Sequence, residues 1–262
     1  MKDIMNHKKI EWWICNIILL VILCATLYPI VYKAFSELSG TEVVFSLKEI
    51  KNVLLLSDRY HKSFLNSIFL SIIITVGQTL FGILMAFVFS KFTFKFRDLL
   101  FYVCVLLMIL PTQTLLVQTY TTVENLSLLD SYGGVIIPQI FLPIGVLFLR
   151  QYFCRISDSV IEASLIDGVS TIKCLTKIIL PMSKNGVLLL AFLSFVDTYS
   201  MYELPLTVLR DAEKFPLSLI FRNVIEKYPE TIFVPAVLYM VPAVMLFIML
   251  KDNIVNGMVN NE

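Results

Sequence analysis

Six long apolar segments constrain the fold of this chain more than any other feature of its sequence. A helix needs about 20 residues to cross the hydrocarbon core of a membrane, and most of the segments reach or approach that length. With 58% hydrophobic and 16% charged residues, the chain is too apolar for an ordinary soluble domain of its size. We therefore expect an all-α, polytopic membrane protein in which residues 1–262 form a single transmembrane domain. The segments lie at about 12–32, 64–90, 99–120, 134–149, 186–209 and 231–250.

Two of the six segments are less regular than the others. The fourth is short and contains two prolines and a glycine, so a complete span there must extend through Tyr132 or the neighbouring ends. The first follows Lys8 and Lys9, as the apolar region of a signal peptide would, but it continues past Tyr28 without a small-residue cleavage pattern. We predict that this first segment is retained as a helix.

The basic residues of the short loops predict which side of a membrane each loop faces. Cytoplasmic loops carry an excess of Lys and Arg. Residues 91–98 contain three basic residues and one acid, whereas residues 121–133 contain two acids and no base. The sequence therefore predicts a cell-membrane protein with both termini in the cytoplasm, on the same side as the loop 150–185.

The loop 150–185 contains the pattern of a short amphipathic helix. Ser157 or Asp158 can cap its start, and Glu162 lies in the first turn, where the helix dipole favours an acid. Apolar residues then recur about every four positions, which predicts one apolar face. Such a face needs a partner, either another protein or the surface of a membrane. The apolar positions are Ile161, Leu165, Ile166 and Val169.

A sharp turn and a second helix are predicted to follow in the same loop. Gly168 lies where the first helix would need a left-handed residue at its end. Ser170 can cap a second helix over 171–179, before Pro181. We therefore predict a helix, a turn at Gly168 and another helix.

This loop resembles the signature of inner-membrane permease subunits of ABC importers, which reads Glu-Ala-Ala, three residues, Gly, nine residues, Ile, one residue, Leu-Pro. Only Ser164 departs from it. In that family the loop folds into a cytoplasmic coupling helix that docks into a cleft of the ATP-binding subunit. The resemblance implies a pore-forming subunit that is driven by a separate ATPase. It assigns ATPase coupling to Glu162, Ala163, Ser164, Leu165, Asp167, Gly168, Ile178, Leu180 and Pro181.

The resemblance extends over about residues 64–210, within a permease core of about 64–250, and is strongest to the carbohydrate branch, specifically the second permease of maltose-type importers. It implies four kinds of protein or solute partner: a second permease, a dimer of ATP-binding cassette subunits, an external or periplasmic solute-binding protein and a sugar. ATP and magnesium would be held by the ATPase, with no cofactor or metal in this chain, and membrane lipid would surround the helices. The supporting segments are 65–67, 91–94, 110–113, 128–131, 149–153 and 166–168.

The fifth segment contains candidate residues for a solute path. A charged side chain within a membrane costs about 2.5–3.5 kcal/mol unless it faces water or a partner, so Asp197 and Glu203 are predicted to line a wet interior. Tyr199, Tyr202 and Glu203 would share one helical face and offer a ring for stacking on a sugar. Contact with the sister permease explains the same polar residues equally well. The candidates are Gln113, Asp197, Tyr199, Ser200, Tyr202 and Glu203.

At the place where the carbohydrate branch usually carries Trp-Asn, this chain has the acidic and aromatic residues of 197–203, which leaves the identity of the sugar open. A permease for a non-sugar solute is one alternative. An ion- or proton-coupled secondary carrier is another, although such carriers usually show an internal duplication that is not evident here.

Other classes of function find little support in the sequence. The net charge of +1 argues against a chain that covers nucleic acid. The chain has no phosphate-binding loop of the ATPase type. His7 and His61 lie outside the apolar segments, at opposite ends of the first one. On one continuous helix Asp197 and Glu203 would point about 240° apart, so they could not act as a catalytic pair. We predict no catalytic residue.

Overall fold

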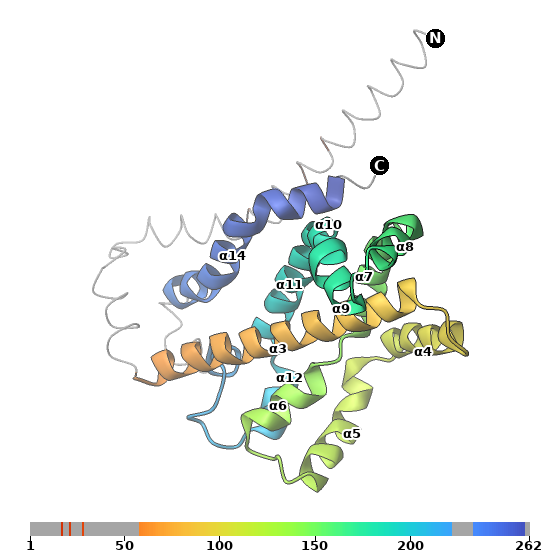
Figure 1. Ribbon diagram of the computed structural model, residues 1–262. Coiled ribbons are helices and arrows are strands. Elements are labelled where there is room, and N and C mark those ends of the chain that lie inside the picture. The colour runs from red at the N-terminus through yellow and green to blue at the C-terminus, as the bar shows by residue number, and fades with distance from the viewer. Residues whose placement is uncertain (1–16, 18–20, 22–27, 29–57, 222–232, 260–262) are drawn as a thin grey trace. The chain divides into compact units, whose positions relative to one another are not determined.

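The computed structural model describes residues 17, 21, 28, 58–221 and 233–259. The chain divides into two compact units, Met1–Asn52 and Val53–Glu262. In the first unit, Ile17, Val21 and Tyr28 are helical and exposed, and the rest of the predicted first span lies outside the described residues. The described part of the second unit consists of helices and contains no strand (Figure 1), which confirms the all-α prediction for that part.

The longest described helix is α3 (Asp58–Lys91), which covers the predicted second span and packs against α7 and α11. Its residues Tyr60–Lys91 are long and apolar enough to cross a membrane as one straight element. It begins before the predicted boundary because the polar residues that precede the apolar run are also helical. α3 is therefore the element on which the rest of the unit is assembled.

The third and fourth predicted segments are each two helices joined at a bend. The third segment consists of α4 (Arg97–Ile109) and α5 (Thr112–Asn125). The fourth consists of α6 (Tyr132–Gln139) and α7 (Pro143–Cys154), which meet at an angle of 41°. Each pair together is long and apolar enough to cross a membrane. In both, the second helix begins at or directly after a proline, which suits a helix start because the N–H that proline lacks has no partner there. The fourth segment does extend to Tyr132, as its length required.

The fifth predicted segment is interrupted as well, because α11 (Lys184–Tyr199) ends before α12 (Glu203–Val208) begins. Tyr202 has φ −120° and ψ −48°, outside the helical conformation. The prediction that Tyr199, Tyr202 and Glu203 share one continuous helical face is therefore wrong, and so is the angle inferred between the two acids. The physical reason is Pro205, which has no N–H to donate and whose ring would clash with a carbonyl one turn earlier in a continuous helix.

The last described helix, α14 (Phe233–Val259), covers the predicted sixth segment and continues beyond it, and it packs against α11. Many side chains on the outer sides of α3, α4 and α14 are large, apolar and exposed. Such surfaces are expected where helices face lipid or other membrane subunits.

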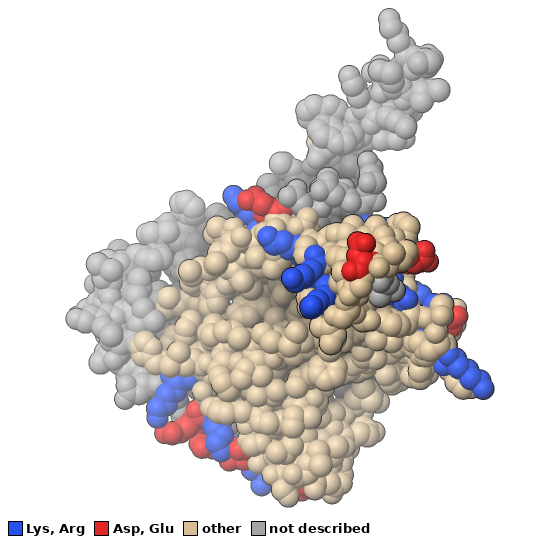
Figure 2. Space-filling model, in the orientation of Figure 1, with Lys and Arg blue, Asp and Glu red and all other residues tan. Residues whose placement is uncertain are grey.

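Two of the three buried apolar clusters among the described residues hold most of the helices of this unit together. One joins α3, α7 and α11 to the loop 150–185 and includes Phe87, Leu149 and Phe153. The other joins α3 to α5, α6 and α12 and includes Ile74 and Val208. On the face that Figure 2 shows, charged side chains gather near the start of α3 and around the loop 150–185, with a largely uncharged surface between them. The visible face of this unit thus has two charged regions, each with its own candidate site.

Candidate functional site

The loop 150–185, called the coupling loop below, begins with the predicted amphipathic helix, α8 (Asp158–Ile166). The Ser157 hydroxyl accepts a hydrogen bond from the Ser159 N–H (3.3 Å), so the predicted cap is confirmed. Gly168 follows with φ 75°, which confirms the predicted left-handed turn. The turn is closed by the Val169 N–H, which donates to the carbonyl of Ser164 (3.0 Å).

After the turn, the chain is helical from Thr171 to Met182 but changes its winding twice. A short α9 (Thr171–Cys174) is followed by a π-helical turn, η1 (Leu175–Ile179), and by α10 (Leu180–Met182). Ser170 holds the predicted cap position, although its side chain makes no capping hydrogen bond. The sequence did not predict the π turn. Such a turn shifts the backbone hydrogen bonds directly before Pro181, where one N–H is missing.

Ser164, which departs from the permease signature, lies between the two arms of the coupling loop. It is buried (5% exposed), its hydroxyl donates to the carbonyl of Ile161 (2.8 Å), and its oxygen lies 3.4 Å from the Cys174 sulfur. A small polar side chain at this position therefore links α8 to α9.

The outer surface of the coupling loop combines apolar and acidic side chains. Ile166 is 86% exposed and Ile172 is 75% exposed, and Glu162 and Asp167 are exposed as well. Ile166 does not extend the inward-facing apolar side that holds Ile161 and Val169, which pack on the buried cluster with Ile178 and Leu180. Ala163 and Pro181 are exposed, and the side chain of Leu165 lies outside the described part. The exposed pair of isoleucines is a surface that a second protein can cover.

Lys91, at the end of α3, holds the start of the coupling loop. Its ammonium lies 2.7 Å from the Asp158 carboxylate and also donates to the carbonyl of Ile156. The Lys91 side chain is only 3% exposed, whereas the Asp158 side chain is 79% exposed, so the lysine is shielded from water and its partner carboxylate is not. This pairing ties α8 to the helix at the centre of the unit.

We expect Lys91→Met to reduce transport coupling more than Asp158→Asn does. Methionine keeps much of the length but leaves the Ile156 carbonyl without its donor, at a cost of about 1–3 kcal/mol for a buried polar group. Asp158 is mostly exposed (79%), so its loss is compensated by water. The measurement is ATP hydrolysis per solute transported by the purified complex in vesicles. Equal effects of the two variants would contradict this role of Lys91.

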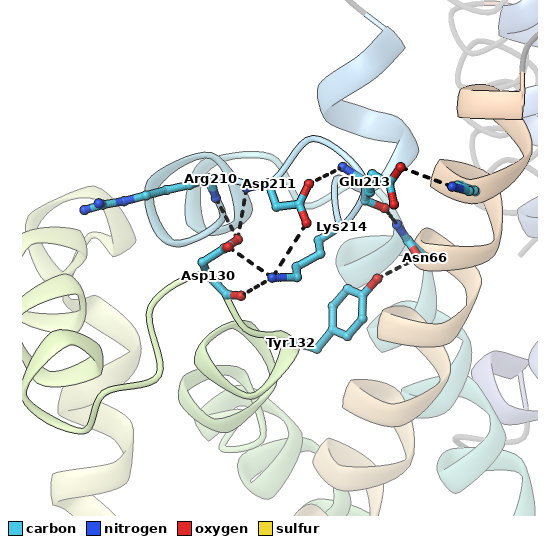
Figure 3. Close-up of polar contacts among 8 residues, drawn as sticks. Asn66, Asp130, Tyr132, Arg210, Asp211, Glu213 and Lys214 are labelled. Carbon is cyan, nitrogen blue, oxygen red and sulfur yellow. Dashed lines mark hydrogen bonds and ion pairs between the residues drawn. The ribbon is translucent and has the colours of Figure 1, made fainter.

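At the other end of α3, Asp130 joins the connection between α5 and α6 to the segment after α12 (Figure 3). One carboxylate oxygen of Asp130 accepts the backbone N–H groups of Asp211 (3.0 Å) and Arg210 (3.1 Å), and the other lies 3.0 Å from the Lys214 ammonium. These hydrogen bonds lower the pKa of Asp130 to about 2. The same contact with Asp130 raises the pKa of Lys214. Both groups are therefore charged across the pH range of ordinary media.

The contacts at this end continue onto α3 (Figure 3). The Tyr132 hydroxyl donates to the Asn66 side-chain oxygen (2.9 Å), and the Asn66 amide donates to the carbonyl of Glu213 (2.8 Å). In the sequence, Asp130 stands out only as part of the segment 128–131, and no local pattern points to Lys214. The sequence signal for Asp130 is an aspartate in a loop between two apolar segments. Aspartate is enriched in the left-handed conformation, which Asp130 adopts with φ 54°.

The structure brings two of the predicted solute-path residues together. The Gln113 amide donates to the Glu203 carboxylate (3.4 Å), and both side chains are exposed. Gln113 lies beside the break between α4 and α5, and Glu203 lies beside the break between α11 and α12. Two interrupted spans thus place their polar side chains next to one another.

The other solute-path candidates lie apart from that pair. Tyr199 is 3% exposed and packs against Phe195 and Tyr239, with ring centroids 5.6 and 5.0 Å away. Asp197 is exposed on α11, and Ser200 is exposed with its hydroxyl donating to a carbonyl of the preceding turn. Tyr202 is half-buried at the break. Of the aromatic candidates, only Tyr202 retains a partly accessible ring.

Comparison with known proteins identifies similar chains. Residues 78–260 match the family model described as the binding-protein-dependent transport system inner membrane component. The sn-glycerol-3-phosphate transport system permease protein UgpE of Salmonella choleraesuis is 27% identical over 232 residues, which cover 86% of this chain and 83% of the relative. The protein of the same name from Yersinia pestis bv. Antiqua is 28% identical over 203 residues, covering 76% and 72%.

A solved structure has the same fold. It is the crystal structure of a bacterial ABC transporter involved in the import of the acidic polysaccharide alginate, and the matched chain superposes with a TM-score of 0.78 at 22% identity. The match covers 93% of this chain and 96% of the matched chain.

Proposed function

Because the chain belongs to the family of inner membrane components of binding-protein-dependent transport systems, we propose that it is the permease subunit of an ATP-driven importer for a sugar or oligosaccharide. The observation that carries the coupling role is the coupling loop, in which Gly168 turns the chain left-handed and Ile166 and Ile172 remain exposed. The solute class rests on the relatives, whose names refer to glycerol 3-phosphate and alginate.

In this proposal, residues 1–262 form one permease domain with six spans, three of which are bent. Both termini and the coupling loop face the cytoplasm, in agreement with the basic residues around the end of α3. A sister permease and lipid would cover the exposed apolar faces, and an external solute-binding protein would deliver the solute. A dimer of ATPase subunits would bind ATP and magnesium. This chain would then transmit the conformational change of the ATPases and would not itself hydrolyse ATP.

Transmission would begin at α8. The Lys91 contact and the packing of Ile161 and Val169 fix this helix to α3 and α7, so a force on the exposed side of α8 displaces the helices behind it. Closure of the ATPases would then favour one of two arrangements of the spans, in the way that any ligand favours the state it binds more tightly.

A reconstituted uptake assay tests this function directly. The complex of this chain with its sister permease and ATPases, in vesicles with the solute-binding protein, should accumulate solute when ATP is supplied. An imposed ion or proton gradient without ATP should produce no accumulation. Uptake driven by the gradient alone would instead establish the secondary carrier.

We expect Glu162→Lys to weaken association with the ATPase. The sequence prediction that Glu162 lies in the first turn is wrong, because α8 begins at Asp158 and Glu162 is in the middle of the helix. The change instead reverses the charge of an exposed side chain beside the docking surface. Co-purification of the ATPase with the membrane subunits measures the effect. A matched control is Lys95→Glu, which reverses a charge on the exposed turn between α3 and α4, outside the coupling loop, and should leave association unchanged. If Glu162→Lys retains full association and coupling, Glu162 has no docking role.

We propose that Gln113 and Glu203 line the solute path at the level of the two helix breaks. Gln113→Leu should then reduce solute-stimulated ATP hydrolysis at normal assembly, because the exposed polar pair that can hydrogen-bond a hydroxyl-rich solute is lost. Gln118→Leu on the same helix is the control, since Gln118 lines a groove between α5 and α6 instead. A Gln113→Leu complex that assembles poorly but transports normally per complex would place the pair at the seam with the sister permease.

A further inference from the structure

Helix α3 carries a hydroxyl side chain at every fourth position through much of its length. Residues four apart lie on the same side of a helix, so these side chains form one hydroxyl ridge. The first four are buried against other elements of the unit. Hydroxyl groups buried inside a membrane protein need partners. The ridge consists of Ser63, Ser67, Ser71, Thr75 and Thr79.

Three members of the ridge have partners. The Ser67 hydroxyl accepts the N–H of Leu217 (2.7 Å), and the Ser71 hydroxyl donates to the carbonyl of Ser67 (2.6 Å). The Thr75 hydroxyl lies 3.4 Å from the hydroxyl of Thr198 on α11. The ridge therefore faces α11 at Thr75.

One helical turn further along α3, three polar atoms have no hydrogen-bond partner among the described residues. They are the side-chain oxygens of Gln78, Thr79 and Ser194. Gln78 is 1% exposed and Ser194 is 2% exposed, so bulk water does not reach them. The Gln78 amide nitrogen donates to the carbonyl of Gln139 (2.8 Å), at the end of α6, which orients the side chain and leaves its oxygen free.

The packing of α3 on α11 places the three residues at one level along the two helices. Thr75 faces Thr198, and further along α3 Gly82 lies against Leu190, which comes earlier in α11. The two helices are therefore antiparallel. Thr79 lies one turn after Thr75, and Ser194 lies one turn before Thr198, so the two side chains belong to the same layer. Gln78 precedes Thr79 in that layer.

We propose that this layer of the α3–α11 seam binds an ordered water molecule, held by the side-chain oxygens of Gln78, Thr79 and Ser194. A buried water in a protein makes about three hydrogen bonds to groups that otherwise lack partners. Water can donate to the Gln78 oxygen and accept from the hydroxyls, which satisfies all three atoms. The donors are neutral, and the buried polar side chains of the described residues include no carboxylate, so the site suits water better than a metal cation.

This water would make the seam between α3 and α11 adjustable. A bridging water can exchange hydrogen-bond partners when one helix shifts past the other, so no polar atom is left unpaired. The contact between α3 and α7, which is filled by Leu149 and Phe153, has no such freedom because interlocked apolar side chains must clear one another to slide. The site also adjoins the break between α6 and α7, through the carbonyl of Gln139.

X-ray radiolytic footprinting of the assembled transporter in lipid nanodiscs tests the proposal. Radicals produced from a bound water mark neighbouring side chains even when bulk solvent cannot reach them. Leu190, one turn from Ser194, should be modified several-fold faster than Leu70, a side chain of the same intrinsic reactivity, although both are buried (3% and 1% exposed). Ser194→Val, which fills the site, should lower the modification of Leu190 to that of Leu70. Ser71→Ala, which removes a hydroxyl already bonded to its own helix, should leave it unchanged.

Equal modification of Leu190 and Leu70 in the unmodified complex would overturn the proposal without any variant. Persistent modification of Leu190 in an assembled Ser194→Val complex would overturn it as well. The labelling is also measured with sodium replaced by choline, and a change on that replacement would identify a cation site in place of water.

Discussion

Replacing Gly168 by valine is expected to lower ATP-driven uptake by about 5-fold or more while the complex still assembles. Gly168 has φ 75°, and a β-branched residue resists this conformation at a cost of about 1–3 kcal/mol. A free energy of that size corresponds to about a 5- to 150-fold change in an equilibrium. The strained turn would change the orientation of α8 relative to the ATPase. Uptake and ATP hydrolysis by the purified complex in vesicles measure the loss of coupling.

The structure separates backbone strain from steric conflict at this position. A Cβ atom added to Gly168 would meet no atom within 4 Å, so the size of the new side chain is not the obstacle. Gly168→Asn, which tolerates the left-handed conformation, should therefore retain most of the coupling. If Gly168→Asn is as defective as Gly168→Val, the backbone argument fails.

Replacing Gly134 by alanine should destabilise the end of the molecule that contains Asp130. A Cβ atom there would lie 2.4 Å from the carbonyl oxygen of Leu128 and 2.9 Å from Val123 and Val208. The carbonyl belongs to the backbone and also accepts the Ser131 hydroxyl (2.6 Å), so it cannot move without disturbing the cap of α6. Overpacking of this kind costs about 1–3 kcal/mol. Thermal unfolding of the complex in detergent should shift downward by several degrees.

Gly133 is the matched control for that experiment. Its added Cβ would lie no closer than 3.6 Å to the atoms around it, an ordinary contact. Gly133→Ala should therefore leave the unfolding temperature near that of the unmodified complex. Similar shifts for both variants would show that the close approach at Gly134 does not limit stability.

Two structural features of the coupling loop could be predicted from the sequence because they depend only on neighbouring residues. The cap at Ser157 and the turn at Gly168 depend on residues within a few positions of one another. A side-chain oxygen before a helix and a glycine after it act through the adjacent backbone, whatever packs around them. The exposure of Ile166 could not be predicted in this way, because the positions of α3 and α7 decide which side of α8 is buried.

The helical class, the approximate positions of the described apolar helices and the turn of the coupling loop can be predicted from the sequence, since apolar runs, prolines and glycines act over short distances along the chain. How these parts connect depends on the packing of the helices. Lys91 meets Asp158 across 67 positions and Lys214 meets Asp130 across 84. The pairing of Gln113 with Glu203 likewise depends on two separate helix breaks that end side by side. Such contacts require the packing of several helices at once, and no local pattern specifies which distant side chain completes them.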